Sequence, residues 1–162
     1  MEKKPTPAKY IAQGAIIAAL YVVLTLIFAP ISFGAVQVRI AEALTILPLF
    51  TPTAIPGLFV GCILANLLGG AIALDVVFGS LATLIGAAIG YVLRRNRWLV
   101  PIPAVVSNGV IVPLVLRYGY NVDMPLPLIA LYVVLGEIVG CYILGELLAG
   151  VLLKRGQIFK KK

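Results

Sequence analysis

The stretch LIALYVVLGEIVGCYILGELLAGVLL, residues Leu128 to Leu153, decides the class of this protein. It holds two charged residues, Glu137 and Glu146, and its other residues are apolar or small. An α-helix crosses the hydrocarbon core of a bilayer in about 20 mostly apolar residues. This stretch is long enough to span a membrane with some tilt. The sequence therefore predicts a transmembrane helix here, with a carboxylate near its middle.

The rest of the chain has the same character. Of its 162 residues, 62% are hydrophobic and 12% are charged, and the mean hydropathy is +1.10. A soluble domain typically has about 25% charged residues, so an ordinary water-soluble fold is excluded. We expect a single all-α integral membrane domain over residues 1–162, in which 1–9 and 154–162 are short basic tails.

Five further apolar runs precede the last one. They cover residues 11–29, 38–50, 57–68, 74–93 and 98–116. With the last run they predict six transmembrane helices. The runs 38–50 and 57–68 are short, however, and could form one re-entrant hairpin, which would leave four crossings without changing the side of the tails. We prefer six, because the Leu47–Pro56 turn contains no polar group that would need to be hidden from lipid.

The net charge of +7 arises mainly from three basic clusters. Eleven of the thirteen Lys and Arg residues lie in these clusters: Lys3, Lys4 and Lys9; Arg94, Arg95 and Arg97; Lys154, Arg155, Lys160, Lys161 and Lys162. All three flank apolar runs, and such residues accumulate on the cytoplasmic side of membrane proteins. The charge therefore indicates topology rather than nucleic-acid binding. We expect a multi-pass protein of the cell membrane with both termini in the cytoplasm.

Several kinds of chemistry are excluded by what the sequence lacks. It contains no histidine, so the commonest proton shuttle and metal ligand is missing. It has no GxxxxGK[ST] loop for nucleotide hydrolysis. Cys62 and Cys141 lie in apolar runs without a CxxC partner and are expected to be small buried side chains. We expect no enzyme activity, cofactor or metal, so the energy for active transport must come from an ion gradient or from another chain.

Polar side chains inside the predicted helices mark the candidate site, because such groups are costly in a bilayer and usually face a partner, a cavity or a ligand. At about 1.5 Å per residue, Glu137 and Asn108 fall near the midplane, and no Lys or Arg is near Glu137 in the sequence. These two are the expected central ligands. The other candidates lie in the outer half, at the outer rim or in a loop over the site: Arg39, Glu42, Asn66, Asp75, Gln37 and Phe33. Together they predict a pocket that opens outward and binds a small, flat solute through hydrogen bonds.

Most of these residues also have a purely structural interpretation. Arg39 and Glu42 are three apart on one helix and could neutralise each other. Asp75 could cap the start of a helix. Asn66 and Asn108 could do no more than join helices through side-chain hydrogen bonds.

Small residues recur at four-residue spacing along the predicted helices. The pairs are Ala15 and Ala19, Gly57 and Gly61, Gly86 and Gly90, and Gly136 and Gly140. Such pairs let helix backbones approach closely in lipid, and packing within the bundle explains most of them. Ala15 and Ala19 lie on the first helix, which is often peripheral, so they could instead dock another protein.

Several blocks of the sequence are similar to those of the QueT family. They are AALYVVLT (18–25), APISFG (29–34), QVRIAEALT (37–45), TPTAIPG (51–57), GCILANL (61–67), DVVFGSLAT (75–83) and GEIVGCY (136–142). The resemblance implies a six-helix S-component fold. S components are the substrate-binding subunits of energy-coupling factor transporters, and members of this family are assigned to queuosine precursors such as 7-aminomethyl-7-deazaguanine. It also implies a transmembrane coupling protein and two cytoplasmic ATPases as partners. An AxxxA stripe on the first helix of S components docks the coupling protein, and Ala15 and Ala19 match that pattern.

Two modes of transport follow from the residues and the resemblance. In the first, the chain binds the precursor outside and carries it inward by reorienting in the membrane, driven by partner ATPases. In the second, it acts alone as a proton-coupled secondary transporter in which Glu137 is the coupling carboxylate. The first agrees with the resemblance and with the missing ATPase motif.

Overall fold

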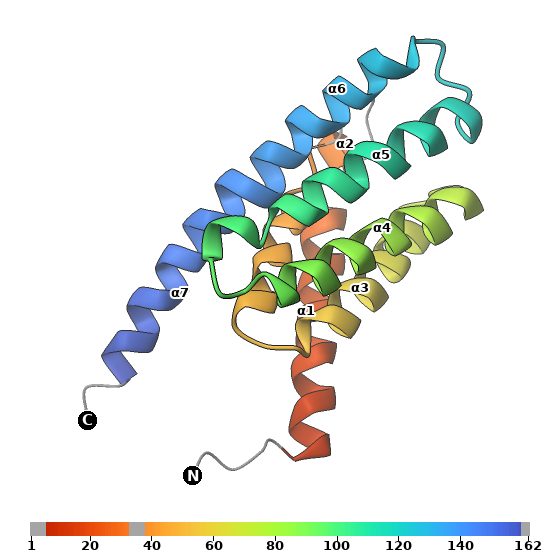
Figure 1. The fold of residues 1–162 in the computed structure, drawn as a ribbon. Coiled ribbons are helices and arrows are strands. Elements are labelled where there is room, and N and C mark those ends of the chain that lie inside the picture. The colour runs from red at the N-terminus through yellow and green to blue at the C-terminus, as the bar shows by residue number, and fades with distance from the viewer. Residues whose placement is uncertain (1–5, 33–37, 160–162) are drawn as a thin grey trace.

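The computed structural model of the protein describes residues 6–32 and 38–159, and every regular element in these ranges is helical (Figure 1). Most are α-helices, η1 and η2 are 3₁₀-helices, and η3 is a π-helix. In chain order the elements are α1 (Pro7–Ile27), α2 (Ala29–Ser32), η1 (Ile40–Leu49), α3 (Ala54–Leu68), α4 (Ala73–Val92), η2 (Arg97–Leu99), α5 (Ile102–Tyr118), α6 (Leu126–Glu137), η3 (Ile138–Leu144) and α7 (Gly145–Phe159).

Several of these helices are suited to a membrane. Within the described ranges, four helical segments are long and apolar enough to cross a bilayer: Pro7–Ile27, Ala73–Val92, Arg97–Tyr118 and Leu126–Arg155. Two apolar helices are shorter, namely η1 and α3. The prediction of an all-α membrane protein is confirmed. These two short helices correspond to the runs 38–50 and 57–68, which from the sequence could form either two crossings or one re-entrant hairpin.

The helices form one bundle with two distinct ends. α4 packs against α5 and α3, α3 packs against α1, and α5 packs against α6. α1 begins and α7 ends at the end of the bundle where α4 connects to α5 (Figure 1). The α3–α4 and α5–α6 connections lie at the opposite end. Arg94, Arg95 and Arg97 in the α4–α5 connection therefore share one end of the molecule with the last turns of α7.

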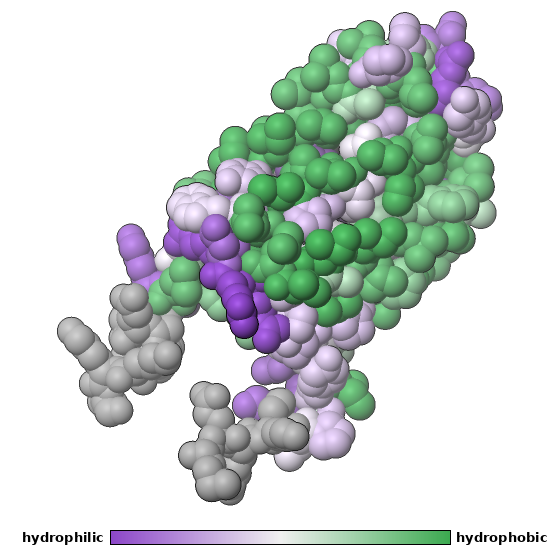
Figure 2. Space-filling view, in the orientation of Figure 1, coloured by the Kyte–Doolittle hydropathy of each residue, from purple (hydrophilic) through white to green (hydrophobic). Residues whose placement is uncertain are grey.

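The exterior of the bundle is apolar. Figure 2 shows hydrophobic residues across the middle of the visible face, with hydrophilic residues gathered toward the two ends. Large apolar side chains are exposed on the long helices, including Ile16 on α1, Val77 on α4, Val110 on α5 and Leu131 on α6. A continuous apolar exterior between two polar ends is the surface that a lipid bilayer requires.

Glycines make the closest helix contacts. A Cβ atom added at Gly86 of α4 would lie 2.6 Å from the Cα atom of Ala104 on α5. One added at Gly61 of α3 would lie 2.9 Å from the Cβ atom of Tyr21 on α1. Real Cβ atoms do not approach other atoms so closely, so the two backbones can meet only where the side chain is missing. These glycines therefore pack helices within the chain.

η1 and η3 depart from α-helical geometry, and they pack against each other. η1 is a 3₁₀-helix that contains Pro48, and η3 is a π-helix that begins directly after Glu137. A Cβ atom at Gly140 would lie 2.7 Å from the carbonyl oxygen of Arg39, so the missing side chain allows this approach. Short π-helical turns inside α-helices occur frequently at functional sites.

Candidate functional site

The predicted polar residues that the structure describes are buried inside the bundle. Each of them is at most 5% exposed: Arg39, Glu42, Asn66, Asp75, Asn108 and Glu137. Phe33 and Gln37, the other two predicted ligands, lie outside the described residues. Because buried charged and amide groups are costly unless they are paired, the contacts of these six side chains show how the site is built.

Glu42 and Glu137 form one group around Cys141. η1 supplies Glu42, the last residue of α6 is Glu137, and η3 supplies Cys141 one turn later. The Tyr21 hydroxyl of α1 donates a hydrogen bond to Glu42 Oε1. The Cys141 thiol donates to Glu137 Oε2 at 2.9 Å and lies 3.8 Å from Glu42 Oε2. Asn108 of α5 lies beside the Glu137 carboxylate, so the two expected central ligands are neighbours.

Asp75 is the centre of a second group, where α3 meets α4. The Arg39 guanidinium lies 3.6 Å from Asp75 Oδ2 and forms a salt bridge with it. The Tyr120 hydroxyl donates to the same oxygen at 3.1 Å and accepts a hydrogen bond from the Ile72 backbone N–H at 3.3 Å. The Asn66 side-chain nitrogen donates to the Asp75 carbonyl oxygen at 3.2 Å. The group therefore joins η1, α3, α4 and the α5–α6 connection.

Tyr120 lies in that connection, outside the helices that could span a membrane. Partial burial is the largest cause that raises the pKa of its hydroxyl, and the Asp75 carboxylate raises the pKa further. The hydroxyl therefore remains protonated at neutral pH and can donate to Asp75.

These contacts decide between some of the structural interpretations. The capping interpretation of Asp75 is wrong, because the N-cap of α4 is Ile72 and the Asp75 carboxylate contacts Arg39 and Tyr120 instead. Arg39 forms a salt bridge with Asp75 and also interacts electrostatically with Glu42, and Glu42 accepts a hydrogen bond from Tyr21. The interpretation that Arg39 and Glu42 neutralise each other therefore stays open. Asn66 does join α3 to α4, and within the described part of the chain it does so through its side-chain nitrogen.

The buried ionisable groups of the site include more acids than bases. Glu42, Asp75 and Glu137 are carboxylic acids, whereas Arg39 is the one buried guanidinium among the described residues of the two groups. Acceptor oxygens therefore outnumber cationic donors in an interior without free access to water. Such an interior suits a solute that brings N–H groups or a positive charge, and it does not suit a lipid or an inorganic anion.

The two groups contain residues that sequence reasoning missed. Cys141 was expected to be a small buried side chain, yet its thiol links the two glutamates. Its position four residues after Glu137 was the available signal, because this spacing places both side chains on the same face of one helix. Tyr21 was not singled out, although a hydroxyl inside an otherwise apolar run usually has a partner when buried. Cys62 accepts a hydrogen bond from Thr83 at 3.5 Å, so it also belongs to the polar interior.

Residues 11–154 match the family model described as QueT transporter. The chain belongs to this family. The queuosine precursor transporter QueT of Lactococcus lactis subsp. cremoris (strain MG1363) is 37% identical to it over 81 residues, which are 49% of this chain and 47% of the relative. The match thus spans about half the length of that curated relative. No solved structure matches the chain.

Membership of the QueT transporter family makes the chain a membrane transport protein, in agreement with its apolar helices. It also confirms the resemblance found in the sequence blocks. The buried polar groups are the candidates for a solute site in such a protein.

One subset of the site in this QueT family member has the composition of a metal site. Glu42, Glu137 and Cys141 each offer a ligand atom, and these atoms lie within 4.8 Å of one another. Carboxylate oxygen and thiolate sulfur are ligands that Zn²⁺ accepts. The Cys141 thiol already donates a hydrogen bond to Glu137 Oε2 and Glu42 Oε1 accepts one from the Tyr21 hydroxyl, so a metal ion at the sulfur would have to displace the thiol proton. The arrangement therefore matches a hydrogen-bond network better than a metal centre.

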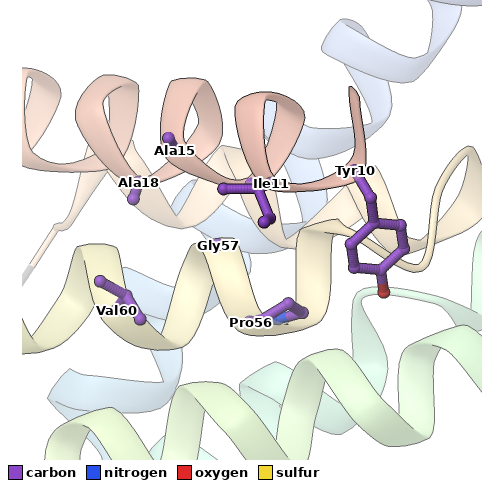
Figure 3. Close-up of a pocket in the computed structure, with 8 residues that line it drawn as sticks. Tyr10, Ile11, Ala15, Ala18, Pro56, Gly57 and Val60 are labelled. Carbon is purple, nitrogen blue, oxygen red and sulfur yellow. The ribbon is translucent and has the colours of Figure 1, made fainter. Parts of the chain in front are cut away.

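The small-residue stripe of the QueT family member faces outward. Ala15 and Ala19 of α1 are both exposed. Ala15 borders an apolar groove of about 310 Å³ between α1 and α3 (Figure 3). The groove is lined by Tyr10, Ile11, Gly14, Ala15, Ala18, Pro56, Gly57 and Val60. Its lining suits an apolar helix or an acyl chain and offers no recognition to a polar solute.

Proposed function

We propose that the protein is the substrate-binding S component of an energy-coupling factor importer. In this role it captures a queuosine precursor, 7-aminomethyl-7-deazaguanine or a related deazapurine, from outside the cell. The observation that supports this most directly is the buried cluster of Glu42, Glu137, Asn108 and their hydrogen-bond partners inside an apolar bundle. Family membership supports transport, and the name of the Lactococcus relative supports the class of solute.

The chemistry of the solute fits the chemistry of the site. The pyrimidine edge of a deazaguanine presents N–H donors side by side, and the aminomethyl group is a primary ammonium. A carboxylate accepts several hydrogen bonds at once, and an amide both donates and accepts. In this proposal Glu137 and Asn108 are the central ligands, and Arg39, Glu42, Asn66 and Asp75 either contact the solute or hold those that do. Phe33 and Gln37 belong to the loop that would cover the site.

The same proposal assigns the topology and the partners. The chain would cross the membrane six times with both termini and the Arg94–Arg97 connection in the cytoplasm, as the positive-inside rule requires. A transmembrane coupling subunit would dock on Ala15 and Ala19, of which Ala15 borders the open groove beside α3. Two cytoplasmic ATPase subunits would supply the energy, because the chain has no nucleotide-binding loop of its own.

Binding and transport test the proposal separately. Isothermal titration of the purified chain with 7-aminomethyl-7-deazaguanine should show binding that an equal concentration of adenine does not reproduce. Liposomes that hold the chain alone should not accumulate the compound, whereas liposomes that also hold the coupling and ATPase subunits should accumulate it with ATP and not with a non-hydrolysable analogue.

The rival mechanism predicts a different result in the same liposomes. If the chain is a proton-coupled transporter that uses Glu137, a proton gradient alone drives accumulation without partner subunits. That result would replace the S-component proposal.

A further inference from the structure

Two buried oxygen atoms at the junction of α3 and α4 lack a hydrogen-bond donor among the described residues. They are Oδ1 of Asn66, a residue with 0% exposure, and Oδ1 of Asp75, a residue with 1% exposure. Buried acceptors are almost always paired in folded proteins, because an unpaired one has lost its hydration without a replacement. Two such atoms on neighbouring side chains therefore point to a donor that comes from outside the described residues.

The orientation of both side chains is fixed by their other contacts. The Asn66 nitrogen donates to the Asp75 carbonyl oxygen at 3.2 Å, which a flipped amide could not do because two acceptor oxygens would then meet. Asp75 Oδ2 takes the Tyr120 hydroxyl at 3.1 Å and the Arg39 guanidinium at 3.6 Å. Each residue thus uses one polar atom to hold its place and keeps the other oxygen available.

Gly79 gives the Asp75 carboxylate its space. It lies one turn after Asp75 on α4, and a Cβ atom at this position would be 2.7 Å from Asp75 Oδ1 and 3.3 Å from the Asn66 side-chain nitrogen. Any other residue would push the carboxylate away from Asn66. Glycine is unfavourable in the interior of a helix, so a glycine here needs a local reason, and room for these two side chains supplies one.

We infer that Asn66 Oδ1 and Asp75 Oδ1, held beside Gly79, form a subsite that accepts hydrogen bonds from an N–H-rich group of the transported solute. This inference rests on the proposed function and concerns the same solute. Two parts of 7-aminomethyl-7-deazaguanine have this chemistry, the primary ammonium and the amino-substituted pyrimidine edge. The surplus of buried carboxylates over guanidinium groups agrees with either donor.

The substitution Gly79→Ala tests the subsite, with Gly150→Ala as the matched control. Gly150 lies in α7, and a Cβ atom there would have no neighbour within 4 Å. Titrations use 7-aminomethyl-7-deazaguanine and its 7-cyano analogue, which lacks the ammonium. Gly79→Ala should weaken binding of the aminomethyl compound about tenfold or more, as expected for losing a hydrogen bond to a charged group, and Gly150→Ala should leave it unchanged. Weakening of the aminomethyl compound alone assigns the ammonium to the subsite, and equal weakening of both assigns the pyrimidine edge.

A second variant, Asp75→Asn, keeps the shape of the side chain and decides the question if Gly79→Ala does not fold. Arg39 and Tyr120 both donate toward Oδ2, so the amide oxygen of the new residue should face them and its NH₂ group should face the subsite. A donor then replaces an acceptor, and affinity should again fall about ten- to a hundredfold. If the parent protein binds and both variants bind equally well, the two oxygens are satisfied by water and the inference is overturned. If the parent protein binds neither compound, the proposed function itself fails.

Discussion

Two helix contacts in this molecule depend on a glycine but have different roles. One is the contact between α4 and α5, and the other is the contact between η1 and η3. In both, a glycine brings two backbones together, Gly86 against Ala104 in the first and Gly140 against Arg39 in the second. The first contact joins two regular α-helices. The second joins a 3₁₀-helix to a π-helix, and these irregular segments bring Glu42 and Cys141 together. Regular helices thus form the scaffold, and irregular ones position the polar side chains of the site.

The largest loss of stability should come from a substitution in the α4–α5 contact. Gly86→Leu places a branched side chain where even a Cβ atom would lie 2.6 Å from the Ala104 Cα atom. We expect a loss of about 3 kcal/mol or more in the free energy of unfolding, because neither backbone can yield without separating α4 from α5. Thermal melting in detergent measures this loss. Gly150→Leu is the control, and equal melting of the two variants would show that the α4–α5 contact is not essential.

The next largest effect should come from the polar residues near η1 and η3, where a substitution should weaken solute binding rather than stability. Glu137→Gln keeps the shape of the side chain but removes a charge and exchanges one acceptor for a donor. A hydrogen bond to a charged group contributes roughly 1.5–3 kcal/mol, so the affinity for 7-aminomethyl-7-deazaguanine should fall about ten- to a hundredfold. Titration and melting of the same sample separate binding from stability.

Glu146→Gln is the matched control for Glu137→Gln. Glu146 lies on the same continuous helical segment but pairs with Arg97 at 3.0 Å, near the end that holds the α4–α5 connection. Its variant should bind with unchanged affinity. A lower melting temperature with intact affinity in Glu137→Gln would instead make Glu137 part of the scaffold and remove the distinction between the two regions.

The smallest effect on the isolated protein should come from the outer face of α1, which belongs to neither region. Ala15→Trp and Ala19→Trp alter exposed positions, so we expect melting and solute affinity close to those of the parent protein. An indole cannot fit into a close helix contact, so assembly with the coupling subunit and uptake should be impaired. Co-purification with that subunit measures assembly. Normal assembly of both variants would show that this stripe faces lipid only.

The sequence was sufficient to predict which polar residues lie inside the helical bundle, but not which of them contact one another. Glu137, Asp75 and Asn66 stand out because polar groups are costly in apolar segments, and the structure buries all three. The pairing of Arg39 with Asp75, and of Tyr21 with Glu42, joins different helices. Such pairing depends on how helices pack, which a single helix does not reveal.

The irregular geometry of η1 and η3 was also not predicted, for a related reason. Residues 38–50 and 128–153 are apolar almost throughout, so the spacing of their hydrophobic residues does not distinguish a 3₁₀-, α- or π-helix. Pro48 in η1 and Gly140 in η3 were local indications of an unusual backbone. They acquire that meaning only once the two segments are seen in contact.

The π-helical segment affects which single-residue deletions the last membrane helix can tolerate. A π-turn contains more residues than the α-helical turn it replaces. Deleting one residue between Ile138 and Leu144 would convert the segment into a continuous α-helix and leave α7 in nearly its present rotation, because the extra residue is the one that the wider turn accommodates. Deleting one residue from the regular turns of α6 would instead rotate everything after it by about 100°, and the face of α7 that now packs on η1 would turn toward lipid. The segment is thus a point at which the last membrane helix can lose a residue and still present the same face of α7 to η1.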